Sequence, residues 1–473
     1  MTQEPSLLAR FSRLPVATKA HRQWALMLSG VFLFELADLN TFALVAPELR
    51  VQWQLSVADV GLVTSMGFIG MFVGSTAGGR LSDIYGRKRP LVWSAVVFSV
   101  ASVLSAFSPN LVVLGVFRVL TGVGLTAMTA VGLSYISEMF PRELRGRYLA
   151  LVFGTGLAGI PMIAWFARLV VPADRDGWRW VFVVGGLGIV VAACMARWLP
   201  ESVRWQVVHG QSQRAEILIE RLEREAVARL GRPLPPPVEP AAVPDRGRPG
   251  ELLTPRHRRK TVVLVVVSVF AVVGFYGYTS FVPTLLVEHG FDVVESLTYT
   301  SVVMLGAIPG ALLAWLFIDR WERKYSLGVL YLVITVLVLV YGSAGESTLI
   351  MVVGFTIAML LQTATVVAFT YGPEIFPTEL RGLGSGLSNG LGRLAAFGSS
   401  NLLPVIFSAL GYNAVFVYVA LALAISGTTM LLWGERTTGR SLEAVGAEQV
   451  PEPAAESGPR AAEHPLGTPP RST

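Results

Sequence analysis

Long apolar runs separated by short polar segments make up most of this chain. Each run is about as long as the roughly 20 residues that a helix needs to cross a bilayer, and it is apolar on all sides rather than along one stripe. Such runs satisfy their backbone polar groups in lipid as helices. We therefore predict twelve membrane-spanning helices, at residues 24–49, 57–79, 90–108, 111–138, 147–171, 179–199, 260–287, 297–318, 326–343, 348–373, 383–410 and 412–433.

Composition also places the chain among integral membrane proteins. Of its 473 residues, 53% are hydrophobic and 15% are charged, and the mean hydropathy is +0.57, whereas soluble domains are more polar. The predicted units are a cytoplasmic N-terminal tail (1–23), two six-helix halves (24–199 and 260–434), a cytoplasmic central loop (200–259) and a largely disordered cytoplasmic C-terminal tail (435–473). Within the central loop, the charge pattern from Gln213 to Arg229 predicts a solvated helix.

The positive charges indicate how the helices are oriented. The net charge is +6, but the cations lie in short loops and flanks rather than on one soluble face, which argues against a nucleic-acid partner. They cluster in every second loop, as at Arg10, Arg13, Lys19 and Arg22, at Arg80, Arg87, Lys88 and Arg89, and at Arg256, Arg258, Arg259 and Lys260. This distribution predicts a multi-pass protein of the cell membrane, a monomer in the lipid bilayer, with both termini in the cytoplasm.

Signals for catalysis are weak throughout the sequence. The single cysteine, Cys194, lies in an apolar run and allows no internal disulfide. The spacing Gly154-x-Gly156-x-x-Gly159 resembles a dinucleotide fingerprint but has no preceding strand. We find no phosphate-binding lysine loop, metal-ligand cluster or catalytic triad in the sequence. The chain is therefore expected to be no enzyme and to need no cofactor, metal or ATP.

An internal repeat relates the two halves. Asp83, Arg87 and Lys88 recur 236 residues later as Asp319, Arg323 and Lys324, and Glu138 and Arg145 recur at the same offset as Glu374 and Arg381. Two separate motifs at one offset indicate an internal duplication. Because each half has an even number of helices, the repeats have parallel topology, the arrangement in which two halves rock about a central site.

These motifs resemble those of the major facilitator superfamily, and within it the sugar-porter-like and organic-solute:proton symporter branch. The resemblance covers nearly the whole chain and rests on Gly79 to Arg89, Glu138 with Arg145-Gly146, Pro200 to Trp205, and Thr437 to Glu443. It implies an all-α fold of twelve transmembrane helices in two pseudo-symmetric halves, and secondary transport by alternating access. Similar signatures occur in carriers of sugars, aromatic acids, niacin and cationic solutes, so they do not identify the substrate.

The resemblance further implies a charge network that gates the cytoplasmic side. Its predicted members are Asp83, Arg87, Lys88, Glu138 and Arg145, with Asp319, Arg323, Glu374 and Arg381 as the second copy. In the family, such a network braces the outward-open state and breaks when the halves rock inward. The second copy has Glu322 where the first has the loop glycine Gly86. The alternative interpretation is that these charges set topology alone.

Glu35, Asp38 and Arg118 are charged residues that lie inside predicted membrane spans. Each costs roughly 2.5 to 3.5 kcal/mol near the bilayer centre, so such residues face a wet cavity and pair. We expect Asp38 to pair with Arg118, and Glu35, three residues before Asp38, to lie on the same helical face. The resemblance implies that these positions couple transport to protons; a purely structural ion pair is the alternative. The pattern Glu35-Leu36-Ala37-Asp38 departs from the Asp-Gly-x-Asp of aromatic-acid symporters.

Polar and aromatic residues within otherwise apolar runs outline a substrate site. The candidates are Trp165, Tyr276, Tyr278, Gln362, Asn389 and Arg393, which offer hydrogen bonds and aromatic faces. We expect a proton-coupled symporter of a small polar organic solute, with an organic acid favoured because Arg118 and Arg393 would both face the cavity. The alternatives are a sugar or polyol porter, a proton-driven exporter and a sensor that binds solute without moving it. The short tail argues against the sensor.

Overall fold

The computed structural model describes residues 6–141, 144–237, 248–317, 321–377 and 380–437. Within this part of the chain all regular structure is helical, and twelve helical spans are long and apolar enough to cross a membrane. Nine of the spans are single continuous helices in which backbone amides and carbonyls pair, and the other three are split into shorter segments. The continuous spans are α2 (Lys19–Trp53), α3 (Val57–Tyr85), α4 (Lys88–Ala106), α5 (Leu111–Met139), α12 (Pro255–Thr279), α16 (Arg323–Ser343), α17 (Ser347–Glu374), α18 (Arg381–Leu410) and α19 (Tyr412–Trp433).

Six spans depart from an unbroken hydrogen-bond ladder. Pro47 lies inside α2, Pro373 inside α17 and Pro404 inside α18, and each proline removes one backbone donor although the helix continues past it. The other three spans are each split into two α-helical segments, and one of them ends in a short 3₁₀ helix. They are α6 (Arg145–Leu157) with α7 (Gly159–Val170) and η1 (Val171–Ala173), α8 (Gly177–Gly185) with α9 (Gly188–Trp198), and α14 (Val293–Met304) with α15 (Ala307–Phe317).

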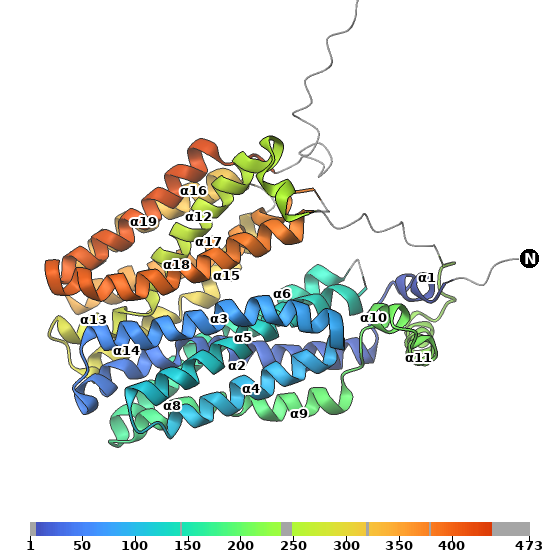
Figure 1. The fold of residues 1–473 in the computed structure, drawn as a ribbon, viewed down its shortest axis with the longest axis horizontal. Coiled ribbons are helices and arrows are strands. Elements are labelled where there is room, and N and C mark those ends of the chain that lie inside the picture. The colour runs from blue at the N-terminus through green and yellow to red at the C-terminus, as the bar shows by residue number, and fades with distance from the viewer. Residues whose placement is uncertain (1–5, 142–143, 238–247, 318–320, 378–379, 438–473) are drawn as a thin grey trace, which may run out of the picture.

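The spans form two bundles, as predicted from the repeat (Figure 1). The first bundle runs from α2 to α9, and the second contains α12, the short α13 (Val282–Glu288) and α14 to α19. Because each bundle contains an even number of spans, α2 begins and α19 ends at the same side of the molecule. We call this the terminal end, defined by Lys19 and Trp433, and we call the other the opposite end. The predicted tail from 438 onward lies outside the described residues.

The helices begin and end at different residues than the apolar runs predict. The first span begins at Lys19 instead of residue 24, and the second continues to Tyr85 instead of residue 79. Polar residues at both places extend the helix beyond the apolar run, because backbone hydrogen bonding does not require an apolar side chain. The turn between α3 and α4 therefore contains only Gly86 and Arg87.

Gly86 makes this turn possible. Its φ of +89° lies in the region that favours glycine, and a Cβ there would collide with the carboxylate of Glu201. That carboxylate accepts hydrogen bonds from the backbone N–H groups of Arg87 (2.6 Å) and Lys88 (3.1 Å) at the start of α4. The segment after the sixth span is thereby attached to the beginning of the third.

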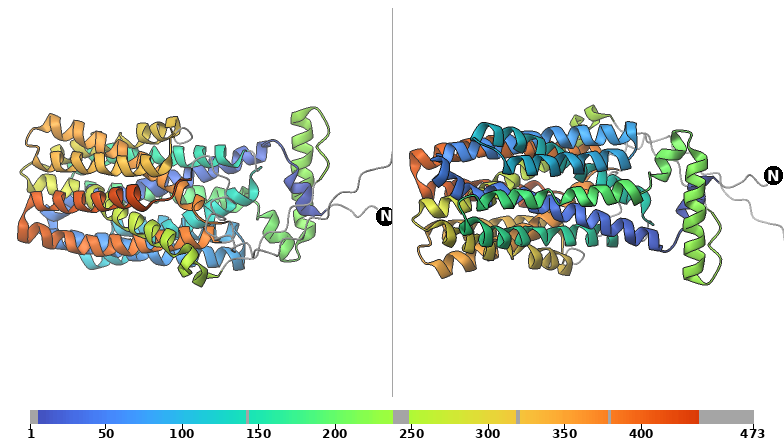
Figure 2. Two further views of the ribbon diagram at one scale, coloured as in Figure 1. Left: turned by 90° about the horizontal axis from the view of Figure 1, so that it is seen from above. Right: turned by 90° about the horizontal axis from the view of Figure 1, so that it is seen from below.

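A cap at the terminal end joins the N-terminal tail to the central segment (Figure 2). It consists of α1 (Leu7–Ser12), α10 (Val203–Val208) and α11 (Ser212–Leu230), with α11 running across the end of the first bundle. Glu223 of α11 pairs with Arg10 at 2.8 Å and with Arg13 at 2.7 Å. The prediction of a solvated helix holds for one face only, because the other face buries Ala215, Ile219, Leu222 and Ala226. The short η2 (Pro249–Leu253) precedes α12.

The two bundles meet at the opposite end. There Arg50 of α2 pairs with Glu288 of α13, and Arg168 of α7 donates a 2.5 Å hydrogen bond to Thr298 of α14. These two contacts cross between the bundles, whereas the ion pairs of Arg87 with Glu138 and of Arg323 with Glu374 at the terminal end each join helices of one bundle. Figure 1 accordingly shows the ribbons closer together near α13 and α14 than near the terminal end.

Candidate functional site

A cavity lies between the two bundles, and helices of both contribute to its wall. Its polar lining residues are Asp38 from α2, Thr64 from α3, Arg118 and Thr121 from α5, and Tyr276 from α12, with Ser280 just after α12. Its apolar wall includes Phe42, Val63, Phe68, Met71 and Leu125. A mostly apolar cavity with a few convergent polar groups is typical of a small-molecule site.

Asp38 and Arg118 form the expected ion pair inside this cavity. Arg118 Nη2 lies 3.2 Å from Asp38 Oδ2, and both residues are buried, with Asp38 fully inaccessible and Arg118 7% exposed. Arg118 also donates to the hydroxyls of Thr41 (3.1 Å) and Thr121 (3.2 Å). Breaking such a pair by removing one partner leaves an uncompensated buried charge, which is strongly destabilising.

Three residues that the sequence reasoning missed complete the surroundings of Asp38. The hydroxyl of Ser102 in α4 donates to Asp38 Oδ1 at 2.5 Å, and the ring of Phe182 lies 5.0 Å from the Arg118 guanidinium. Gly185 allows α8 to come this close, since a Cβ there would lie 2.6 Å from Asp38 Oδ1. Small residues are common in membrane helices, so their identity alone does not single out these positions.

Glu35 lies one turn from Asp38 but has different partners. It is 4% exposed, and its Oε1 accepts a hydrogen bond from Thr129 of α5. Its Oε2 is buried without a hydrogen-bond partner in the described structure. The charged side chain that attracts it electrostatically is Arg393 of the second bundle. The structure thus separates the two acids that share a helical face, since only Asp38 is ion-paired with Arg118.

Arg393 of α18 reaches the cavity from the second bundle. It donates a 2.6 Å hydrogen bond to the hydroxyl of Tyr276 and lies 3.5 Å from the sulfur of Met71 in the first bundle. The Tyr276 ring packs edge-on against Phe68 with centroids 4.6 Å apart. Among the described residues, no carboxylate lies within ion-pair distance of Arg393. A guanidinium has five N–H donors, so most of those on Arg393 remain available to a ligand.

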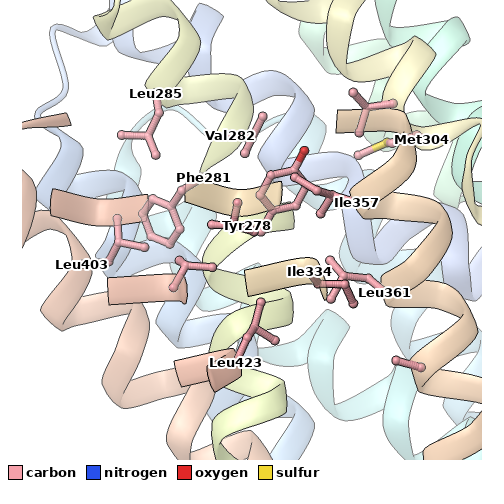
Figure 3. Packing of buried hydrophobic residues seen from close by; sticks show 14 of the residues in the cluster. Tyr278, Phe281, Val282, Leu285, Met304, Ile334, Ile357, Leu361, Leu403 and Leu423 are labelled. Atoms are coloured by element: carbon pink, nitrogen blue, oxygen red, sulfur yellow. The ribbon is translucent and has the colours of Figure 1, made fainter. Parts of the chain in front are cut away.

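The other predicted substrate residues do not line the cavity. Tyr278 is 2% exposed and lies in the core of the second bundle, where its ring faces Tyr341 and is surrounded by apolar side chains (Figure 3). Gln362 is 9% exposed and lies beside Gly310 of α15. Asn389 donates to the carbonyl of Ser385 in its own helix, and Trp165 of α7 is 40% exposed.

The first copy of the predicted gating network is formed within the first bundle. Arg87 lies 2.8 Å from Glu138 and 3.3 Å from Asp83. Glu138 also accepts a 2.5 Å hydrogen bond from Ser202, which precedes α10. Lys88 begins α4 and Arg145 begins α6 at the same end. These contacts join the ends of α3, α4 and α5 to the central segment, while the bundles are in contact at the opposite end.

The second copy is similar in part. Arg323 of α16 lies 3.3 Å from Glu374 of α17, the counterpart of the pair between Arg87 and Glu138. Glu322, which replaces the loop glycine, accepts a 3.0 Å hydrogen bond from the backbone N–H of Thr437 after α19. Arg381 begins α18, and Asp319 lies outside the described residues.

Metal-ligating side chains do not gather anywhere in the described ranges. Among the described residues, no three His, Cys, Asp or Glu side chains are grouped so that they could hold one metal ion. The polar groups that line the cavity are a carboxylate, a guanidinium group and hydroxyls.

Comparison with known proteins agrees with this architecture. YyaJ of Bacillus subtilis, whose name assigns it to metabolite transport, is 35% identical over 437 residues, which cover 92% of this chain and 96% of YyaJ. The niacin transporter NiaP of Acinetobacter baylyi is 29% identical over 448 residues, covering 93% and 99% of the two chains. The fold resembles the xylose transporter XylE from E. coli in a partially occluded inward-open conformation, with a TM-score of 0.72, 17% identity and coverage of 89% and 99%.

The family assignment follows from a match along most of the sequence. Residues 27–400 match the sequence model described as Major Facilitator Superfamily. This range includes the cavity residues of both bundles and both copies of the charged motif. Both the fold and the relatives agree with the resemblance first seen in the loop from Gly79 to Arg89. The chain belongs to the Major Facilitator Superfamily and is a non-enzymatic secondary transporter of metabolites.

Proposed function

We propose that this transporter moves a small organic anion together with protons, by alternating access of one central cavity to the two sides of the membrane. The observation that carries the proposal is the presence of two different cationic sites around that cavity. One holds Arg118 against Asp38, and the other leaves Arg393 with a tyrosine hydroxyl and a thioether. The first suits proton coupling and the second suits a carboxylate ligand.

Arg393 supports the assignment of an anionic substrate. Arginine binds carboxylates through two parallel hydrogen bonds, and the hydroxyl of Tyr276 lies next to the guanidinium as a further polar group. Phe68 and Tyr276 supply aromatic surface on either side of the interface between the bundles. The relative NiaP is a niacin transporter, and niacin is a carboxylic acid that combines these two features.

Asp38 and Glu35 support the assignment of proton coupling. A carboxylate beside a guanidinium stays ionised until a proton or an anionic ligand competes for one partner. Asp38 lines the cavity, where a substrate can influence its pairing with Arg118. Glu35 offers a second carboxyl with one oxygen lacking a hydrogen-bond partner within the described structure. Protonation at these acids would then be linked to substrate binding.

The orientation of the protein follows from its charges. The terminal end carries the cap, both charged motifs and most of the loop cations, and positive loops face the cytoplasm. We assign the terminal end to the cytoplasm of the cell and the contacts at Arg50 and Arg168 to the outside. With the bundles joined at the outside, we assign the structure to an inward-facing state. The pairs of Arg87 with Glu138 and Asp83 remain formed in it because all three residues belong to one bundle, contrary to the expectation that the network breaks.

A sugar or polyol porter is the second candidate, because the stretch from Pro200 to Trp205 resembles a sugar-porter motif. In the structure this stretch contacts other parts of the protein and does not line the cavity. Glu201 accepts a hydrogen bond from the backbone N–H of Lys88 in α4, and Trp205 donates to the carbonyl of Asp83. Its role is therefore compatible with any substrate, and it does not favour sugars over acids.

Uptake into proteoliposomes with an imposed pH gradient tests the proposal. Labelled nicotinate, benzoate and xylose are compared, with protein-free liposomes as the control because weak acids also cross bilayers unaided. We expect an acid to accumulate above the level of the control and an uncoupler to abolish the excess. Accumulation of xylose instead would favour the sugar porter, and outward movement alone would favour an exporter. Ligand-dependent thermal stabilisation without any flux would favour a sensor.

A further inference from the structure

A groove separate from the central cavity lies on the outer side of the second bundle, between α12 and α19. Its volume is about 440 Å³, and it is lined by Arg258, Arg259, Val262, Val263, Val266, Thr429 and Trp433. The arginines come from the first turns of α12, and Trp433 is the last residue of α19. The groove therefore begins at the terminal end and continues along the apolar part of α12.

The residues of the groove change from charged to apolar along its length. Arg258 and Arg259 are exposed at its outer end, and Val262 and Trp433 are each 50% exposed. Tryptophan is enriched where membrane helices meet the headgroup layer. Val262 and Val266, four residues apart, lie on one face of the helix below the arginines. This sequence of groups matches that of a phospholipid, with a polar head above an acyl chain.

Charge determines which lipid the groove suits. Within the part of the chain that the structure describes, neither guanidinium has a hydrogen-bond or ion-pair partner, and no acidic side chain lines the groove. Arg256 and Lys260 lie next to the same turn of the helix. Basic pockets between transmembrane helices bind anionic headgroups, and arginine pairs with phosphate through two hydrogen bonds.

We propose that this groove binds one anionic phospholipid, whose phosphate is held by Arg258 and Arg259 and whose acyl chain lies along Val262 and Val266. The site is independent of the substrate and belongs to one bundle alone. A zwitterionic lipid has the same chains but no net negative charge, so it binds less well. Each basic residue near a membrane surface contributes about 1 kcal/mol, which corresponds to about a fivefold change in affinity.

Native mass spectrometry of the purified full-length protein tests this assignment. Phosphatidylglycerol and phosphatidylcholine are titrated separately onto the wild type, onto Arg258→Gln with Arg259→Gln, and onto Arg89→Gln with Arg147→Gln. The last variant removes the same charge from exposed positions at the terminal end of the first bundle. We expect the first variant to bind phosphatidylglycerol about 25-fold less tightly, with no change for phosphatidylcholine and little change in the control.

Two further measurements locate the lipid. Val266→Phe fills the groove while retaining both arginines, and it is expected to weaken phosphatidylglycerol binding as well. Phosphatidylglycerol with brominated acyl chains is expected to quench more tryptophan fluorescence in the wild type than in Trp433→Phe. Brominated phosphatidylcholine is expected to show a smaller difference between the two proteins.

An equal loss of phosphatidylglycerol binding in both double variants would mean a diffuse charge effect and would overturn the proposal. So would displacement of the lipid by soluble glycerol phosphate, or occupation of the groove by a second copy of the chain.

Discussion

Arg118 and Arg393 are both arginines beside one cavity, but their surroundings differ. Arg118 is ion-paired with Asp38 and donates to two threonine hydroxyls. Arg393 donates to the Tyr276 hydroxyl and approaches the sulfur of Met71, and none of the described acids pairs with it. An arginine whose charge is already balanced has little to gain from an anion, whereas one without a carboxylate partner has much to gain. We infer that proton coupling depends on the charged pair of the first bundle and that substrate affinity depends on the arginine of the second bundle.

The largest effect is expected when Asp38 is replaced by Asn. The amide cannot take up or release a proton in the physiological range, so pH-driven accumulation should be lost while counterflow exchange of substrate continues. Asp174→Asn, at an exposed acid after η1, is the control. The measurement is the steady-state accumulation of a transported acid in proteoliposomes, with and without a pH gradient. Unaltered pH-driven uptake in Asp38→Asn would refute the role given to Asp38.

Because the substitution leaves Arg118 without its buried partner, it also costs stability, by about 3 to 5 kcal/mol. Retained counterflow and a single symmetric peak in size-exclusion chromatography show that the variant is folded. If both are lost, Ser102→Ala keeps the ion pair and removes only the hydroxyl that donates to Asp38. That variant is expected to shift the pH dependence of uptake without abolishing it.

A smaller effect, on affinity instead of coupling, is expected for Arg393→Gln. A hydrogen bond to a charged group contributes about 1.5 to 3 kcal/mol, so the KM for an acid should rise about 10- to 150-fold. Tyr276→Phe removes a neutral partner of Arg393 and should raise KM less. Initial rates of uptake over a range of acid concentrations measure both values, with Arg214→Gln on α11 as the control. A rise in KM of the same size for Asp38→Asn would contradict the division between bundles.

The smallest effect concerns the cap, which is attached to the first bundle alone. Partial burial raises the pKa of the Glu223 carboxyl, but hydrogen bonds from Arg10 and Arg13 lower it by more, so its pKa lies below the ordinary value of 4.5. The ionised form is thus favoured in the folded cap, whose stabilisation is present above the pKa of the unfolded chain and is lost as pH falls through the lower folded pKa.

Glu223→Gln should therefore weaken the attachment of α1 to α11. Partly exposed ion pairs contribute about 0.2 to 1 kcal/mol each, so the protection of amides 7–12 against hydrogen exchange should fall by a few-fold. Glu220→Gln, at an exposed position on α11, is the matched control. Exchange rates are corrected for the intrinsic pH dependence, and the difference between wild type and variant should shrink below about pH 4. Equal protection in all three proteins at neutral pH would contradict this account of the cap.

The fold can be predicted from the sequence because both of its signals, the apolar runs and the repeat at one offset, are visible along the chain itself. Asp38 and Arg118 were also predictable as a pair, because two opposite charges in lipid need each other. Tyr276 and Tyr278 could not be distinguished, since residues two apart on a helix point about 200° apart and the sequence does not show which side meets the cavity. The structure places Tyr276 on the cavity wall and Tyr278 in the core.

The remaining site residues depend on distances between helices. Ser102 and Gly185 approach Asp38 because α4 and α8 come close to α2, and neither residue type is unusual in a membrane span. The many charges of α11 led to the prediction of a solvated helix, and its apolar face is recognised only from the structure, where α1 packs beside it. Sequence patterns report on one helix at a time, whereas these contacts belong to pairs of helices.

The contact between Arg393 and Met71 is a place where oxidation would change how the two bundles hold together. A thioether is a weak hydrogen-bond acceptor, so parting the bundles at this point costs little free energy. Oxidation to methionine sulfoxide would give Met71 a polar oxygen, a far better acceptor for the guanidinium 3.5 Å from its sulfur. A sulfoxide at Met71 would then hold the two halves together at the centre and slow their movement, and its reduction back to the thioether would reverse the effect.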